Sequence, residues 1–167
     1  MTSHMAREIA EQPAAARRTL DALLPLRPEI RALMGTRTRV LLVARGSSDN
    51  AAIYGRYLLE TAAGVPAGLA APSVATHYGA RLDLSDTLVV AVSQSGETTE
   101  IVQTQEWAAS CGAATVAVTN GAGSTLATES DLALVTQAGP EVARTAPNNN
   151  QTQQGAGGVE PERRAQR

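Results

Sequence analysis

Lysine is absent from this sequence of 167 residues, and all fourteen of its basic residues are arginine. A Schiff base with a carbonyl substrate needs a side-chain amine, and a guanidinium group cannot take its place. Chemistry through a lysine Schiff base is therefore excluded for this chain.

Cysteine and histidine are almost as scarce. Cys111 is the single cysteine, so the chain can form neither an internal disulfide nor a cysteine-based metal cage. His4 and His77 have no ligand-like spacing, and the acidic residues show no metal-loop pattern. The sequence therefore predicts no bound metal and no other cofactor.

The chain also lacks blocks of one charge and long apolar runs. Its 14 basic and 16 acidic residues give a net charge of −2, and neither sign is clustered, which argues against a nucleic-acid or anionic-membrane surface. No run approaches the roughly 18 apolar residues of a membrane-spanning helix, and the first residues do not resemble a signal peptide. We expect a cytoplasmic protein without nucleic-acid or membrane partners.

The most informative stretch that is present runs from Leu88 to Glu100 and reads LVVAVSQSGETTE. Its unbroken apolar beginning is typical of a parallel strand covered on both faces. Apolar residues then recur at helical spacing from Ile101 to Ala109. The hydroxyl-rich segment from Ser93 to Thr99 is therefore predicted as a strand-to-helix loop, where free N–H groups favour an anion.

A second unit of strand, glycine, hydroxyls and helix lies nearer the N-terminus. Residues Arg39 to Ala44 (RVLLVA) are followed by Arg45-Gly46-Ser47-Ser48-Asp49-Asn50 and then by an apolar stripe that indicates a helix to about Ala63. One of Ser48, Asp49 and Asn50 is expected to cap that helix. Neither hydroxyl loop has the G-x-G-x-x-G or G-x-x-x-x-G-K-[ST] pattern, which argues against dinucleotide and P-loop nucleotide binding.

Strands and helices alternate along the rest of the chain. Further strands are predicted at Ala67–Ala71, Thr87–Val92, Ala114–Thr119 and Asp131–Val135. The alternation predicts an α/β fold with three αβα layers and a five-stranded parallel, flavodoxin-like sheet of order 2-1-3-4-5. In that order the switch point lies between the first and third strands, so the two hydroxyl loops should form one crevice.

The segments on either side of this domain differ in composition. Residues 1–36 are predicted to be leader helices, with Met5–Glu11 and Pro13–Leu24 as separate pieces because proline favours a first helical position. Residues 37–143 make up the single predicted domain. Residues 144–167 are polar, with Val159 as their only large aliphatic residue, and we expect a disordered tail there.

Three motifs make the sequence resemble a known family. Gly46-Ser47-Ser48, the loop Ser93-Gln94-Ser95-Gly96-Glu97-Thr98, and Ala138-Gly139-Pro140-Glu141 occur in the order and spacing of the sugar isomerase (SIS) domain family, especially the isomerase half of the glutamine:fructose-6-phosphate aminotransferases. The resemblance implies a phosphosugar-binding domain related to the aldose-ketose isomerases and aminotransferases of hexosamine phosphate metabolism. The sugar-phosphate contacts that it implies are Ser47, Ser48, Ser93, Gln94, Ser95, Thr98 and Ser124.

Structural roles offer an alternative for parts of this site. Ser95 or Thr98 can serve simply as a helix N-cap. The loop that contains Ser124, which closes over the sugar in relatives, has the composition of an ordinary turn. Glu97 is the one carboxylate predicted at the crevice, and it either moves a proton or caps the helix that it precedes.

The resemblance also leaves catalysis open. The sequence stops short of the second SIS half, from which relatives take their catalytic residues, so we expect activity only if a partner chain completes the site. The alternatives are a non-catalytic sugar-phosphate sensor and an inactive truncated fragment. A single half leaves one face open, which predicts a homodimer or a higher oligomer.

Deletion of residues 146–167 is expected to leave the melting temperature within about one degree, because segments that bury nothing rarely change stability by more than about 0.5 kcal/mol. Calorimetry of the full and the shortened chain measures this difference. A loss of several degrees would show that the segment packs on the domain or on a partner.

Overall fold

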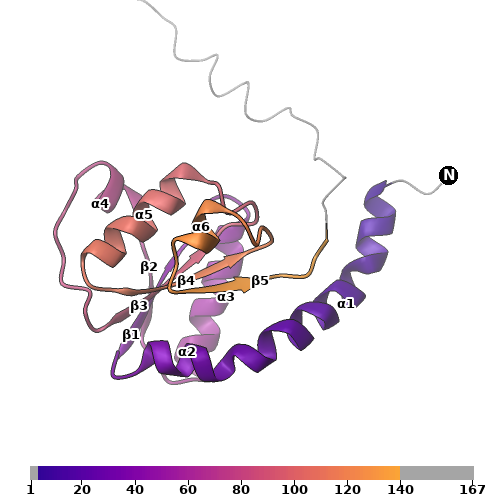
Figure 1. Ribbon diagram of the computed structural model, residues 1–167, viewed down its shortest axis with the longest axis horizontal. Helices are drawn as coiled ribbons and strands as arrows, with labels where there is room; N and C mark the ends of the chain where they lie inside the picture. The colour runs from indigo at the N-terminus through magenta and orange to yellow at the C-terminus, as the bar shows by residue number, and fades with distance from the viewer. Residues whose placement is uncertain (1–3, 140–167) are drawn as a thin grey trace, which may run out of the picture. The chain divides into compact units, whose positions relative to one another are not determined.

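The computed structural model describes residues 4–139 of the chain, and within this range a sheet of five parallel strands forms the centre of the domain (Figure 1). The strands are β1 (Arg39–Val43), β2 (Ala67–Leu69), β3 (Thr87–Val92), β4 (Ala114–Thr119) and β5 (Leu132–Val135). They lie in the order β2-β1-β3-β4-β5, and each neighbouring pair is parallel. The predicted fold class and strand order are confirmed.

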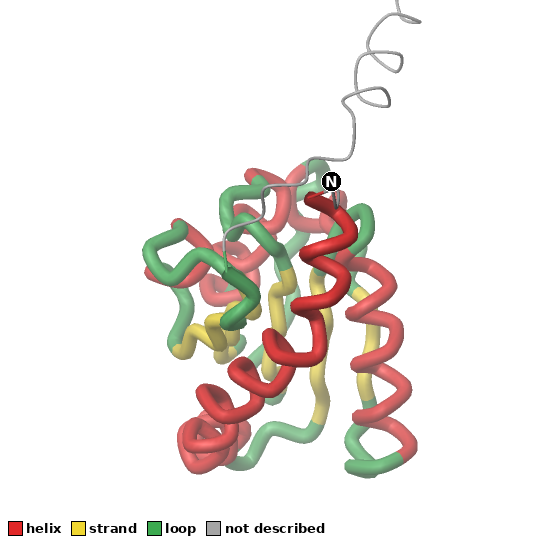
Figure 2. Tube along the Cα trace, turned by 90° about the vertical axis from the view of Figure 1, so that its right-hand side faces the viewer, coloured by secondary structure: helices red, strands yellow, loops and turns green. Residues whose placement is uncertain are grey.

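Helices cover both faces of this sheet (Figure 2). One face packs against α5 (Thr99–Ser110) and α6 (Thr125–Thr128), with α4 (Pro72–Thr76) beside α5. The other face packs against α2 (Arg27–Met34) and α3 (Ser48–Thr61). The arrangement is the predicted three-layer αβα sandwich.

The apolar strand runs follow from this double coverage. Successive side chains of a strand point to opposite faces, so every residue of a central strand meets a helix layer. In β3, Leu88 packs on the α2 and α3 side, whereas Val89 packs on the α5 and α6 side, and both are buried. A polar side chain at either position would have to be buried without a partner, which explains why the run is unbroken.

The N-terminal helices differ from the sequence prediction in one respect. The prediction that two helices meet at Pro13 is wrong, because α1 runs from His4 to Leu23 with Pro13 inside it. A proline removes one backbone hydrogen bond, and the alanine residues 14–16 that follow have the highest helix propensity. A short 3-10 turn, η1 (Leu24–Leu26), then leads into α2.

The remaining boundaries agree with the prediction to within a few residues. Strands β3 and β4 have the predicted ends, and β1, β2 and β5 are one or two residues shorter. The predicted tail, residues 144–167, lies outside the described residues. No helix within residues 4–139 is long and apolar enough to cross a membrane.

Candidate functional site

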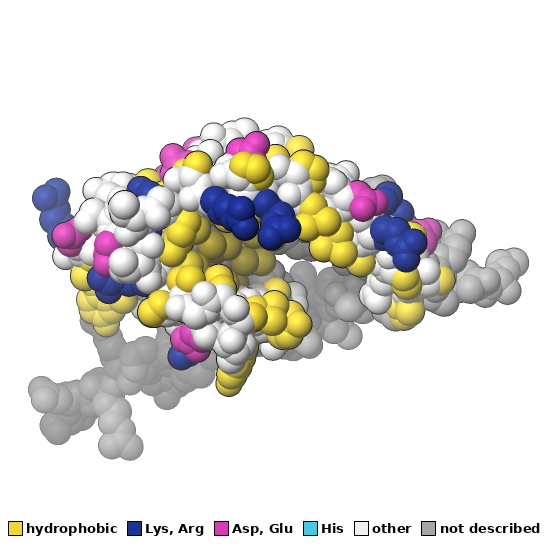
Figure 3. Space-filling model, turned by 90° about the horizontal axis from the view of Figure 1, so that it is seen from below, with side chains coloured by type: hydrophobic (Ala, Val, Ile, Leu, Met, Phe, Trp, Pro, Cys, Tyr) yellow, Lys and Arg dark blue, Asp and Glu magenta, His cyan; other side chains and the backbone are white. Residues whose placement is uncertain are grey.

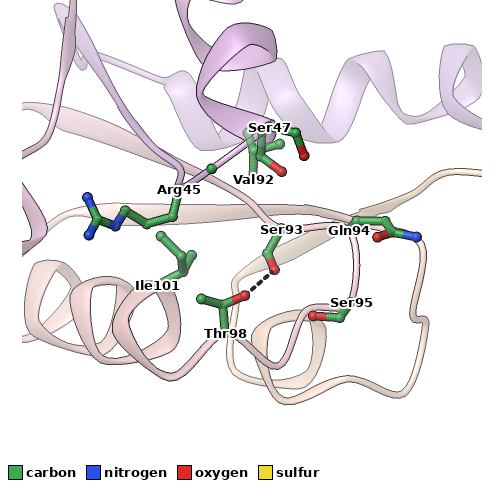
Figure 4. Close-up of a pocket in the computed structure, with 10 residues that line it drawn as sticks. Arg45, Ser47, Val92, Ser93, Gln94, Ser95, Thr98 and Ile101 are labelled. Atoms are coloured by element: carbon green, nitrogen blue, oxygen red, sulfur yellow. Dashed lines mark hydrogen bonds between the residues drawn. The ribbon is translucent and has the colours of Figure 1, made fainter. Parts of the chain in front are cut away.

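A cavity of about 240 Å³ lies at the carboxyl ends of β1 and β3, where the sequence placed the crevice (Figure 4). Two connections contribute to it, the one between β1 and α3 and the one between β3 and α5. The lining residues are Arg45, Gly46, Ser47, Ser48, Val92, Ser93, Gln94, Ser95, Thr98 and Ile101. Of the seven predicted contact residues, six line this cavity and Ser124 does not.

Short hydrogen-bonding groups dominate the segment Ser93–Thr98, which we call the hydroxyl loop. The Oγ of Ser93 and the Oγ1 of Thr98 are 3.1 Å apart, as the dashed line in Figure 4 marks. The backbone N–H of Gly96 donates to Ser93 Oγ at 3.2 Å, and that of Glu97 donates to Ser95 Oγ at 3.2 Å. These bonds fold the loop into a compact turn with its hydroxyls beside the cavity.

Thr98 occupies the N-cap position of α5, but its side chain makes no capping bond. The capping alternative is right about the N-cap position of Thr98, but the hydroxyl is turned toward Ser93 and the cavity instead of capping the helix. The first N–H groups of a helix have no partner within the helix. In α5 the N–H of Ile101 donates to the carbonyl of Thr98, and the N–H groups of Thr99 and Glu100 belong to the end of the helix that adjoins the cavity.

The amino end of α3 is also without a side-chain cap. The helix begins at Ser48, its N-cap is Ser47, and the Ser47 side chain makes no capping bond. The expectation that Ser48, Asp49 or Asn50 caps this helix is wrong, because those three residues already belong to its first turn. Two uncapped helix ends thus adjoin one cavity, and both favour an anion through their aligned peptide dipoles.

Ser124 lies behind the hydroxyl loop rather than in the cavity. It is buried, its hydroxyl donates to the carbonyl of Gly121 at 2.7 Å, and it accepts from the N–H of Ala127 at 3.4 Å as the N-cap of α6. This placement gives Ser124 a structural role, and direct contact with a ligand remains a prediction.

Glu97 is directed away from the cavity as well. Its carboxylate accepts hydrogen bonds from both the backbone N–H and the hydroxyl of Thr125. These two bonds lower the pKa of Glu97 below its ordinary value. The carboxylate thus binds the first residue of α6, whereas the sequence suggested a cap on α5 or a base at the crevice.

Arg45 is the residue at this cavity to which sequence reasoning assigned no role. Its Nε lies 2.9 Å from a carboxylate oxygen of Glu100 in the first turn of α5, so the pair joins the two connections that flank the cavity. The Arg45 side chain is 59% exposed, which leaves the guanidinium partly open to solvent. Its place directly after a strand and before Gly46 was the available signal.

Comparison with known proteins decides the family. A family model of the SIS domain matches residues 33–156. The chain belongs to the SIS domain family.

The most similar relatives of this SIS domain include aminotransferases. It is 42% identical over 154 residues to a glutamine--fructose-6-phosphate aminotransferase of Symbiobacterium thermophilum, with 83% of this chain and 24% of that protein covered. The corresponding enzyme of Halobacterium salinarum is 39% identical, with 86% and 25% covered. The chain thus spans about a quarter of the length of these relatives.

Solved structures agree with this assignment. A protein of Silicibacter pomeroyi, described provisionally as a phosphosugar isomerase, matches with a TM-score of 0.79 and 41% identity over 84% of this chain and 43% of that one. The C-terminal domain of the glucosamine-fructose-6-phosphate aminotransferase of Francisella tularensis matches with a TM-score of 0.76 and 29% identity, covering 84% and 41%.

Gly96 provides a test of how tightly the hydroxyl loop is packed. Its φ is +69°, and an added Cβ would lie 2.1 Å from the hydroxyl oxygen of Ser124, whereas Gly46 has a φ of +63° with no atom within 4 Å of its Cβ position. Gly46→Ala should cost about 1–2 kcal/mol of unfolding free energy for backbone strain. Gly96→Ala should cost about 1–3 kcal/mol more because of overpacking. Urea denaturation compares the two variants, and equal losses would contradict the packing.

Proposed function

We propose that this SIS domain binds a sugar phosphate, with the phosphate held by the hydroxyl loop at the amino end of α5. The observation that carries the proposal is the cavity between two uncapped helix ends, lined by hydroxyls that are turned toward it and not used as caps. A phosphate dianion suits this environment because hydroxyls, backbone N–H groups and helix dipoles all stabilise negative charge.

Each loop has a separate part in the proposed complex. Ser93, Ser95 and Thr98 donate to phosphate oxygens from the β3 side. Ser47 and Ser48 contact the sugar from the β1 side, and the Gln94 side chain, which also lines the cavity, binds a sugar hydroxyl. The relatives support a phosphosugar as the ligand class, since their names concern fructose 6-phosphate and phosphosugars.

Binding is a better-supported function than catalysis for this chain. Aldose-ketose isomerisation requires a base that moves a proton between neighbouring carbons. The described residues that line the cavity include no carboxylate, histidine or cysteine, and Glu97 is bonded to Thr125. We infer that isomerase or aminotransferase activity depends on residues from a partner chain, and that a sugar-phosphate sensor is the alternative function.

The proposal is tested at the hydroxyl loop. Ser95→Ala and Thr98→Ala should each weaken the binding of fructose 6-phosphate about tenfold to a hundredfold, because a hydrogen bond to a charged acceptor contributes about 1.5–3 kcal/mol. Thr99→Ala is the matched control, since Thr99 is the next residue along and does not line the cavity. Isothermal titration calorimetry gives the dissociation constants.

Two further measurements distinguish the possible outcomes. Inorganic phosphate should compete with fructose 6-phosphate, and free fructose should bind far more weakly. A steady-state assay on the same samples separates an enzyme, which turns the sugar over, from a sensor, which only binds it. Unchanged affinity in both variants, with only a lower melting temperature, would reduce the loop to a structural element.

We also propose that the chain associates as a homodimer or a higher oligomer. Four apolar side chains on the outer side of α3, Ile53, Tyr54, Tyr57 and Leu58, are between 41% and 65% exposed. Hydrophobic side chains also line a hollow in the face seen in Figure 3. Apolar surface that gathers in this way is typical of an association site.

Sedimentation at micromolar concentration should therefore detect a dimer or a larger species. Replacing both Tyr54 and Tyr57 with Glu should shift the protein to the monomer, because each charge would have to be buried in the interface. Tyr78→Glu is the control, since Tyr78 is 75% exposed and lies outside α3. A wild-type protein that sediments only as a monomer would overturn the proposal.

A further inference from the structure

The carboxylate of Glu97 joins two loops that are far apart in the sequence. One of its oxygens accepts from the backbone N–H of Thr125 at 2.9 Å, and the other accepts from the Thr125 hydroxyl at 2.8 Å. Glu97 lies within the hydroxyl loop, and Thr125 is the first residue of α6. We call this pair of bonds the Glu97–Thr125 clamp.

Backbone contacts join the same two segments around the clamp. The N–H of Leu126 donates to the carbonyl of Gly96 at 3.0 Å. The carbonyl of Gln94 accepts from the N–H of Asn120 at 3.0 Å and from the hydroxyl of Thr119 at 3.1 Å. Residues 119–126 therefore support the hydroxyl loop on the side away from the cavity.

Close packing leaves this support little freedom to move. Gly96 lies so near Ser124 that no side chain fits between them, and the position of a Cβ on Gly121 would be 3.1 Å from the carbonyl oxygen of Ser95. Hydrogen bonds within the loop include two from backbone N–H groups to serine hydroxyls, one from Gly96 N–H to the carbonyl of Ser93, and one between hydroxyls. Residues 119–126 add to these the contacts that hold the loop from outside.

We propose that Glu97 is a positioning residue for the phosphate site, which acts through Thr125 to hold the hydroxyl loop in its binding geometry. The proposal rests on the proposed function and adds a residue that touches no ligand. Donors bind well only when neighbouring groups fix them near the productive geometry. The clamp provides this from behind the loop, and it also turns the negative charge of Glu97 away from the incoming phosphate.

The contacts of Glu97 fit neither of the two roles that its position in the sequence suggested. A general base would face the ligand, whereas this carboxylate faces α6. A cap of its own helix would bind the first turn of α5, whereas this carboxylate binds the first residue of a different helix, 28 positions along the chain. Residues 120–124 also contact the hydroxyl loop, through Asn120 and Gly121.

Substitutions on both sides of the clamp test the proposal. Glu97→Ala should weaken the binding of inorganic phosphate and of fructose 6-phosphate about tenfold, comparable to losing one hydrogen bond to a charged acceptor. Glu97→Gln should retain most of the affinity, because the amide oxygen accepts the Thr125 N–H and the amide NH₂ can donate to the hydroxyl. Thr125→Ser should bind both probes as tightly as the wild type. The affinity of Thr125→Val should lie between those of the wild type and of Glu97→Ala.

A double variant and a control make the test specific. Glu97→Ala combined with Thr125→Val should bind no more weakly than Glu97→Ala alone, since both changes break the same contact. Glu106→Gln is the matched control, because it removes a carboxylate from an exposed position of α5 that does not line the cavity. Amide hydrogen exchange without ligand should be faster at residues 94–98 in Glu97→Ala.

The outcomes distinguish this proposal from the proposed function. If the wild type binds phosphate and Glu97→Ala binds it equally well, the clamp has no part in binding, and a lower melting temperature would then show a purely structural contact. If the wild type binds neither probe, the proposed function fails and the clamp proposal fails with it. If Glu97→Ala does not fold, the comparison of Thr125→Val with Thr125→Ser decides the question.

Discussion

The parallel pairing of β1 with β3 is the constraint on which the rest of the structure depends. The two strands are in register from Arg39 opposite Thr87 to Val43 opposite Ala91, so they end at the same edge of the sheet. Each strand then passes directly into a hydroxyl-bearing loop and a helix. A slip of one residue would turn buried side chains such as Val43 toward the wrong layer, so burial on both faces fixes the register. The cavity exists because of this shared edge.

The helices α3 and α5, which begin at this edge, both lack the stabilising contact of a side-chain N-cap. A side-chain N-cap contributes about 1 kcal/mol, yet neither Ser47 nor Thr98 makes one, although both are residue types that favour it. Both residues line the cavity instead. By contrast, Ser124 does cap α6. Side-chain capping is therefore absent at the two helix ends where an anion is proposed to bind and present at α6.

The site combines neutral donors with a charge at its margin. Within residues 4–139 the cavity lining holds one charged side chain, Arg45, and this is paired with Glu100. The remaining polar groups are hydroxyls, an amide and backbone. Such a set can bind and orient an anionic ligand, but it offers no group that takes a proton from carbon near neutral pH. This chemical limit explains why the function proposed for the chain is binding, with catalysis assigned to a completed assembly.

The sequence by itself determined the strands, their order and the two loops of the cavity, because apolar runs and the right-handed crossover rule depend on local pattern and short connections. Six of the seven contact residues that the family resemblance implied line this cavity, and their contact with a ligand stays a prediction. Only the tertiary structure decided where Glu97 and Arg45 point and that Ser124 lies outside the cavity. The partners of Glu97 and Arg45 lie on other elements, as in the pair of Arg45 and Glu100, 55 positions apart in the sequence. No periodicity encodes such a contact, since it arises only when the packed sheet brings separate loops together.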